Sequence, residues 1–156
     1  MVAKIRWKPL IVNLAIAFGV EAVSALATRD SMQVYQTLQK PPMSPPGAVF
    51  GIVWSVLFFL MGISAYRVYQ SGAPGTKRAL TVYGVQLLVN FLWSIFFFNL
   101  QAYWFAFVWL VFLWVLVLWM SILFFHADRT AGLLQIPYLI WLTFAGYLSF
   151  GVALLN

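Results

Sequence analysis

The stretch KPPMSPPGAVFGIVW, from Lys40 to Trp54, places four prolines within six positions immediately before a long apolar run. Proline lacks a backbone N–H group and moves the residue before it out of the helical region. The stretch therefore predicts an ordered, non-helical segment that ends where a helix begins. We expect such a stiff segment to hold another part of the protein in place.

The composition indicates an integral membrane protein. Of 156 residues, 64% are hydrophobic and 8% are charged, and the mean hydropathy is +0.94, whereas soluble domains carry about 25% charged residues. The net charge of +6 comes from scattered residues rather than from a basic stripe, which argues against nucleic-acid binding. The chain has no cysteine, which excludes disulfides, thiolate catalysis and cysteine-rich metal sites.

Five segments reach the length of about 20 apolar residues that crosses a bilayer. The sequence thus predicts an all-α membrane protein, a single domain over residues 1–156 with a long ordered loop between its first two helices. In that loop the spacing of Met32, Tyr35 and Leu38 predicts a short surface helix. The five predicted spans are residues 9–28, 47–70, 79–98, 102–125 and 131–154.

The connections between the later spans are short. Residues 71–78 and 126–130 are predicted turns, and the tight connection Asn99-Leu100-Gln101 predicts that the third and fourth helices are antiparallel neighbours. The basic residues then divide unequally between the two faces of the membrane, and the positive-inside rule predicts a cytoplasmic N-terminus. Two lie on the face of the proline segment, Arg29 and Lys40, and seven on the other: Lys4, Arg6, Lys8, Arg67, Lys77, Arg78 and Arg129.

Polar and aromatic residues within the spans gather in the half of the bilayer beneath the proline segment. At a rise of about 1.5 Å per residue, Trp54 lies roughly 10 Å below the start of its helix. The residues recur every three or four positions, so those of one helix share a face. We expect a cavity lined by indoles and amides, with the loop 29–46 as its lid. Its predicted walls are Phe50, Trp54 and Phe58; Gln86, Asn90, Trp93 and Phe97; and Trp141, Ala145 and Ser149.

Several other residues invite a functional or a structural interpretation. Glu21 is the one carboxylate within a predicted span, and it is expected to be neutral or paired with Gln86 or a loop donor. The series Gly47, Gly51 and Ser55 permits close helix contact, either within the chain or in a dimer. Four tryptophans of the fourth helix recur every five residues and share no face, so we assign them to packing and lipid contact: Trp104, Trp109, Trp114 and Trp119.

Three blocks of the sequence resemble the TspO/translocator protein family, also known as tryptophan-rich sensory proteins or the peripheral benzodiazepine receptor family. KPPMSPPGAVFGIVW (40–54) is similar to the family's proline-rich run ending in valine-tryptophan. YGVQLLVNFLWSIFFF (83–98) is similar to its glutamine, asparagine and tryptophan block. PYLIWLTFAGYLSF (137–150) is similar to its proline-tyrosine-leucine-x-tryptophan block.

The resemblance implies a five-helix bundle, often a homodimer, that binds porphyrins such as protoporphyrin IX under the first loop. It also implies a bacterial cytoplasmic membrane location. Some bacterial members are reported to degrade protoporphyrin under light, which makes Trp54 and Trp141 the candidate catalytic residues. The ligand-binding residues carried over by position are Trp54, Asn90, Trp93, Trp141 and Ala145, with Tyr35, Pro41, Phe58 and Gln86 as neighbours.

The chain also departs from the family pattern. Met43 replaces a common tryptophan in the proline segment and Val34 replaces an aromatic residue before Tyr35, which leaves fewer rings near the lid. The tyrosine-plus-basic motif linked to cholesterol in animal members is missing after Ser149, so sterol binding is not expected.

The leading interpretation is a membrane sensory protein that binds a tetrapyrrole, with the porphyrin as ligand and no obligatory cofactor. A light-dependent porphyrin-degrading enzyme is the first alternative, since it needs only an excited porphyrin beside an oxidisable indole. A small-molecule or porphyrin transporter is the second, although the chain shows no inverted repeat or broken mid-membrane helix. His126 beside Asp128 lacks further ligands, so no metal site is predicted.

Overall fold

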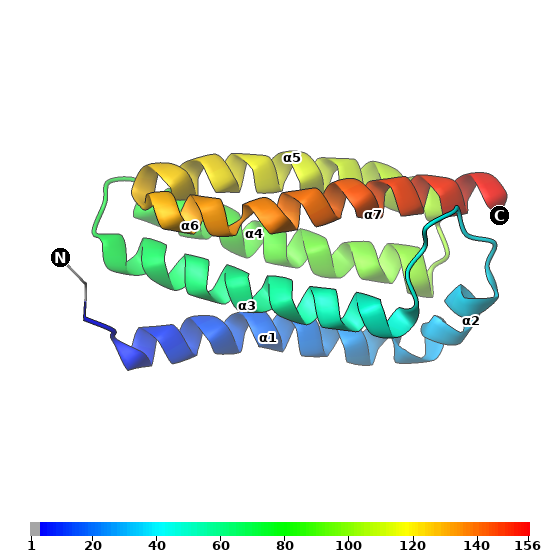
Figure 1. Cartoon of the computed structure of the whole chain (residues 1–156), viewed down its shortest axis with the longest axis horizontal. Coiled ribbons are helices and arrows are strands. Elements are labelled where there is room, and N and C mark those ends of the chain that lie inside the picture. Colours follow the sequence, from blue (N-terminus) through cyan, green and yellow to red (C-terminus); the bar gives the residue numbers. More distant parts are fainter. Residues whose placement is uncertain (1–3) are drawn as a thin grey trace.

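The computed structural model describes residues 4–156, which form a bundle of helices (Figure 1). Within this range, five helices are long and apolar enough to cross a membrane, as expected for a multi-pass membrane protein. The helical elements are α1 (Trp7–Thr28), the 3₁₀ turn η1 (Arg29–Ser31), α2 (Met32–Thr37), α3 (Gly47–Ser71), α4 (Thr76–Ser94), the π-helical turn η2 (Ile95–Asn99), α5 (Tyr103–Ala127), α6 (Arg129–Leu134) and α7 (Ile136–Leu155).

The boundaries of α3 confirm the prediction from the proline stretch. Residues 38–46 are not helical, and α3 begins at Gly47 directly after Pro46, whose backbone is extended. The helix ends at Gly72 with φ 63°, a left-handed conformation that glycine adopts without steric cost. The predicted short surface helix in the first loop is α2.

The last predicted span differs from expectation at its start. The predicted turn at 126–130 shrinks to the single residue Asp128, whose backbone is extended between α5 and α6. The span is also interrupted at Gln135, between α6 and α7. A Cβ on Gly132 would lie 2.5 Å from the Cα of Phe125, so α6 can lie this close to α5 only with glycine there.

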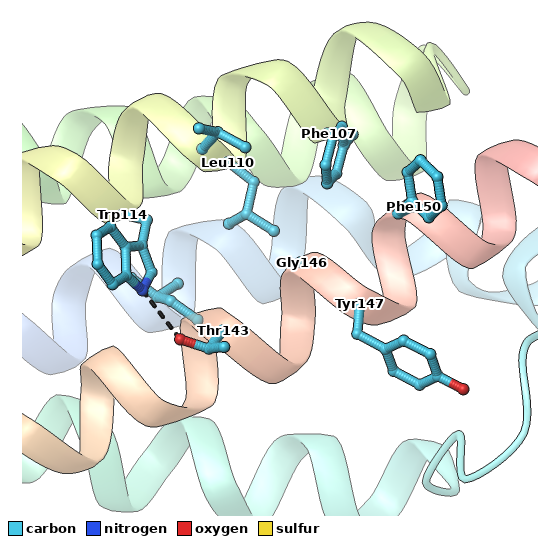
Figure 2. Close-up of a pocket in the computed structure, with 9 residues that line it drawn as sticks. Phe107, Leu110, Trp114, Thr143, Gly146, Tyr147 and Phe150 are labelled. Carbon is cyan, nitrogen blue, oxygen red and sulfur yellow. Dashed lines mark hydrogen bonds between the residues drawn. The ribbon is translucent and has the colours of Figure 1, made fainter.

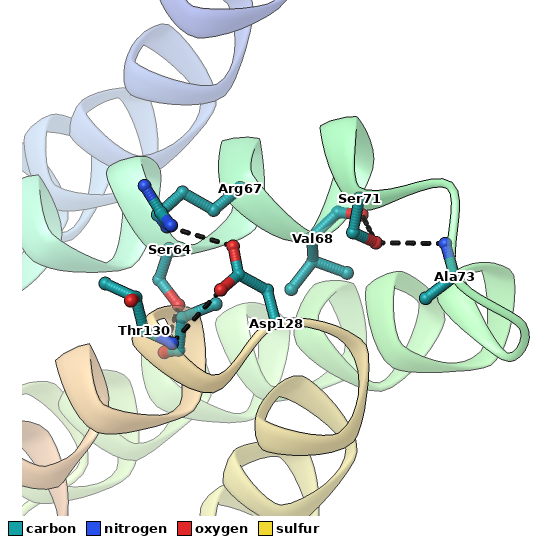
Figure 3. Close-up of polar contacts among 8 residues, drawn as sticks. Ser64, Arg67, Val68, Ser71, Ala73, Asp128 and Thr130 are labelled. Atoms are coloured by element: carbon teal, nitrogen blue, oxygen red, sulfur yellow. Dashed lines mark hydrogen bonds and ion pairs between the residues drawn. The ribbon is translucent and has the colours of Figure 1, made fainter. Parts of the chain in front are cut away.

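Polar contacts fasten α6 to α3 at this end of the bundle (Figure 3). The Arg67 guanidinium lies 2.9 Å from the Asp128 carboxylate, and the same carboxylate accepts a hydrogen bond from the Thr130 N–H at 3.0 Å, which caps α6. The Ser64 hydroxyl donates to the Ala131 carbonyl at 2.7 Å. Two side chains of α3 therefore hold the start of α6 in place.

The two ends of the bundle carry different charges, as predicted. The N-terminal end of α1, the α3–α4 turn and the α5–α6 junction lie together at one end (Figure 1). The other end, called the loop end below, carries α2 and residues 38–46 together with Arg29 and Lys40. Seven basic residues belong to the first end and two to the loop end. The folded bundle therefore keeps the predicted excess of basic residues at one end.

Residues 38–46 are held against α7 rather than standing free. The Asn156 side chain pairs with the Gln39 backbone in both directions, at 2.7 and 3.2 Å, and the Tyr147 hydroxyl donates to the Pro42 carbonyl at 2.8 Å. A Cβ on Gly151 would lie 2.4 Å from the Pro41 ring. Because Gly151 has no side chain, the ring of Pro41 can pack directly against α7.

The buried core lies among α3, α4, α5 and α7, and α1 is peripheral to it. The largest fully buried side chains include Met61, Phe124 and Tyr138, whereas α1 buries only Ala17 and Thr28. Helix α1 therefore contributes one wall to the loop end of the bundle but little to its centre.

Candidate ligand-binding site

A cavity of about 470 Å³ lies at the loop end, between α1, α3 and α4, with η1 and α2 over it. This volume falls within the range of small-molecule sites in proteins. Its walls are mostly apolar and aromatic, with a few polar groups. The lining residues are Glu21, Ser24, Ala25, Thr28, Arg29, Met32, Tyr35, Gly47, Phe50, Gly51, Trp54, Phe58, Asn90, Trp93, Ser94 and Phe98.

Close contact between α1 and α3 gives way to open space toward the loop end. A Cβ on Gly62 would lie 2.8 Å from a methyl group of Leu14, so the two helices are in close contact there. At Gly51 and Gly47, nothing lies within 4 Å of a built Cβ, and both glycines line the cavity. The small residues that suggested tight helix packing therefore provide room for a ligand instead.

Aromatic rings form a connected wall on the α3 side. Trp54 lies 5.8 Å from Phe58 between ring centroids, and Phe50 meets Tyr35 edge to face at 6.1 Å. Tyr35 also contacts Phe98 at 5.4 Å. Through these contacts the ring of Tyr35 joins the loop to the membrane-spanning part of the site.

Two residues of α4 with hydrogen-bonding groups line this apolar space. Asn90 is buried, and its Nδ2 donates to the Tyr138 hydroxyl at 2.6 Å, while no bond to its Oδ1 occurs among the described residues. Trp93 is 7% exposed, and its indole N–H has no partner within residues 4–156. A buried donor without a partner is costly, so Trp93 is suited to a ligand acceptor.

The structure brings five of the nine predicted ligand-binding residues to this cavity: Tyr35, Trp54, Phe58, Asn90 and Trp93. The other four are not among its lining residues. Gln86 is fully buried and accepts a hydrogen bond from Tyr138, and Pro41 contacts Gly151. Trp141 lies behind the aromatic wall, with its ring centroid 6.3 Å from that of Trp54 and 5.5 Å from that of Phe50. Ala145 is buried on α7.

The expected lid also needs correction. The part of the loop that covers the cavity is η1 and α2, through Arg29, Met32 and Tyr35. Residues 41–46, which include all four prolines, do not line the cavity. The proline segment instead fixes the loop to α7, where Pro41 packs against Gly151 and Pro42 accepts a hydrogen bond from Tyr147. It also precedes the start of α3.

Sequence reasoning missed the α1 wall. Glu21, Ser24 and Thr28 recur every three or four residues and so occupy one face of α1, and all three line the cavity. Glu21 accepts a hydrogen bond from Ser55 at 2.9 Å, not from Gln86 or a loop donor as expected. The signal was present in this polar periodicity, but only Glu21 attracted notice as a lone carboxylate.

A second hollow of about 520 Å³ lies between α5 and α7 (Figure 2). Its polar side chains are already engaged: the Trp114 indole donates to Thr143 at 2.9 Å, and Tyr147 bonds to the proline segment. Phe107 and Phe150 close it at the loop end. This groove presents an apolar surface to the membrane, in line with the packing and lipid role expected for the tryptophans of α5.

The fold and its cavity define a small multi-pass membrane protein with an aromatic site at one end of a five-helix bundle. The profile of the TspO/MBR family matches residues 11–155. The chain is 36% identical to the tryptophan-rich sensory protein of Cereibacter sphaeroides over 150 residues, covering 96% of this chain and 92% of that protein. It is 34% identical to the tryptophan-rich protein TspO of Archaeoglobus fulgidus, covering 94% and 96%.

The similarity extends to animals. The human translocator protein is 29% identical over 150 residues, covering 94% of this chain and 89% of that protein. This chain belongs to the TspO/MBR family of membrane sensory and translocator proteins.

Proposed function

We propose that this protein binds a porphyrin, such as protoporphyrin IX, in the cavity between α1, α3 and α4. The observation that carries the proposal is a cavity of about 470 Å³ lined by aromatic rings, among them Trp93, whose buried indole N–H has no partner within residues 4–156. A flat macrocycle offers its face to Phe50 and Trp54 and its polar edge to the groups of α4. Aromatic stacking on a planar ligand contributes about 1–3 kcal/mol per ring.

The polar groups of the cavity suit a largely apolar ligand with a few hydrogen-bonding atoms. Trp93 supplies a donor, and the Oδ1 of Asn90 supplies an acceptor whose position is fixed by the bond from Asn90 to Tyr138. Because the amide is already held, little side-chain entropy is lost when a ligand binds. This preorganisation supports binding and sensing as the primary activity.

The test is a titration of the purified protein in detergent with protoporphyrin IX in the dark, following the Soret band and tryptophan fluorescence. We expect saturable quenching in the wild type. Gly51→Leu adds a side chain at the cavity wall, where nothing lies within 4 Å of a built Cβ, and should abolish saturable quenching.

Gly84→Leu is the matched control. Gly84 is exposed on α4, does not line the cavity and has equally open surroundings. It should leave quenching unchanged. Unchanged spectra in the wild type, or equal loss in both variants, would overturn the proposal.

Light-dependent degradation is a second candidate, favoured by the cluster of oxidisable rings behind the cavity. Trp54 lies in the wall, and both Trp141 and Tyr138 lie within 6.3 Å of it between ring centroids. An excited porphyrin would take an electron from Trp54, with molecular oxygen as the terminal oxidant. Loss of the Soret band under light and oxygen, slowed in Trp54→Phe, would support this reaction, and equal loss without protein would exclude it.

We infer a cytoplasmic N-terminus from the seven basic residues at one end of the bundle and the two at the other. The absence of native cysteine allows a direct test by single-cysteine labelling in intact cells. A membrane-impermeant maleimide should label Ser44→Cys, at the loop end, and not Thr76→Cys. The reverse pattern would invert the orientation.

A further inference from the structure

The cavity wall on α1 carries charge of opposite sign at its two ends. Glu21 and Arg29 both line the cavity and are separated by eight residues, which is about 12 Å along a helix. Glu21 lies within α1, and Arg29 lies at the loop end, directly after α1 ends at Thr28. The basic residue among the lining residues therefore lies at the loop end of the cavity, and the acidic one lies deeper along α1.

Arg29 is available to a ligand. Its side chain is 74% exposed, and its one ion-pair contact among the described residues is with Asp30 at 3.9 Å, which is itself 99% exposed. Exposed pairs of this kind contribute little. The Arg29 guanidinium keeps its donors free to form a bidentate contact with a carboxylate.

The other basic residue of the loop end is occupied. The Lys40 ammonium donates to the carbonyls of Gln36 and Leu38 at 3.3 and 3.4 Å and lies 4.9 Å from the centre of the Tyr35 ring. Lys40 does not line the cavity. Its role is to close the end of α2, which leaves Arg29 as the cation that faces the site within residues 4–156.

Glu21 reinforces this arrangement from the other end. One of its oxygens accepts from Ser55, so the carboxyl group is held beside the cavity. An anionic group of a ligand would be disfavoured beside Glu21 and favoured beside Arg29. The two residues together orient an asymmetric ligand with its acidic edge toward the loop.

We propose that Arg29 binds a carboxylate of the ligand and makes this site selective for amphipathic acids over their neutral esters. The inference rests on the proposed porphyrin site and adds the ligand's charge and orientation to it. A lipid phosphate at the membrane surface offers the same anionic oxygens to Arg29. The experiment therefore begins in detergent free of phospholipid.

The test measures dark binding of protoporphyrin IX, a dicarboxylic acid, and of its neutral dimethyl ester to the wild type and to Arg29→Gln. The expected result is a loss of about 10-fold in affinity for the acid in Arg29→Gln, as for a lost charge-assisted hydrogen bond, and no change for the ester. Arg29→Lys should recover part of the loss, because it keeps the charge without the planar fork. Lys40→Gln is the matched control and should leave the ratio of acid to ester affinity at its wild-type value.

The outcomes separate the inference from the function on which it rests. If neither porphyrin binds the wild type, the proposed function fails. If both bind and Arg29→Gln weakens neither or both equally, the role of Arg29 fails while the site survives. An effect that appears only in nanodiscs containing phosphatidylglycerol would assign Arg29 to a lipid headgroup and overturn the proposal.

Discussion

The hydroxyl of Tyr138 on α7 connects two amides of α4. It donates to the Oε1 of Gln86 at 2.8 Å and accepts from the Nδ2 of Asn90 at 2.6 Å, and all three side chains are buried. Water is scarce at this depth of a membrane protein, so each group depends on the others for its hydrogen bonds. Tyr138 thereby fixes the orientation of the amide that faces the cavity.

Tyr138→Phe should destabilise the protein by about 1–2 kcal/mol, because it leaves buried amide groups unpaired. The measurement is thermal unfolding in detergent. Asn90 would then be free to turn, so porphyrin affinity should fall as well. Tyr147→Phe, which removes a hydroxyl bonded to Pro42 at the exposed surface, is the comparison and should retain affinity.

Gly151→Ala should loosen the proline segment, because the new Cβ would overlap the Pro41 ring. Overpacking of this kind costs about 1–3 kcal/mol. Hydrogen exchange at the Gln39 amide, which is bonded to Asn156, should become faster. Gly146→Ala lies on the same helix with nothing within 4 Å of its Cβ, and equal exchange rates in the two variants would show that Pro41 does not need Gly151.

Asp128 has two separable roles, as an ion-pair partner of Arg67 and as the cap of α6. Asp128→Asn keeps the cap and removes the charge, so its cost should stay below about 1 kcal/mol. Asp128→Ala removes both and should cost about 1–2 kcal/mol. Thermal unfolding of the two variants measures the difference, and identical melting temperatures would show that capping contributes nothing here.

Trp54 and Trp141 should differ in their effect on binding, although the family resemblance treats them alike. Trp54 lines the cavity, whereas Trp141 reaches it only through Trp54 and Phe50. Trp54→Phe should weaken dark porphyrin binding more than Trp141→Phe, as measured by Soret titration. A larger loss in Trp141→Phe would place its indole at the ligand.

The sequence was sufficient for the five spans, because apolar length and proline chemistry act locally. The start of α3 at Gly47 and the short helix α2 were likewise predictable from their own residues. The third span continues through η2 to Asn99, close to its predicted end. The break at Gln135 was not predictable, since it depends on contacts between helices such as that between Gly132 and Phe125.

The site was only partly predictable for a similar reason. Helical periodicity shows which residues share a face, but not which helix that face meets. The predicted face of α3 lines the cavity, and so do Asn90 and Trp93 of α4, whereas Gln86 and Phe97 do not. The face of α7 packs behind Trp54, and α1 takes its expected place. The open space between α1 and α3 depends on how the two helices pack against each other, and the sequence of neither helix reveals this by itself.

The spacing between α1 and α3 sets the width of the site. The two helices are in close contact at Gly62 and Leu14, and open space lies beside Gly51. Helix α1 buries few side chains and is held at this end by the hydrogen bonds of Glu21 with Ser55 and of Ala27 with Asn99, whereas the core lies among α3, α4, α5 and α7. We therefore expect a change in the width of the site to move α1 and to leave this core intact.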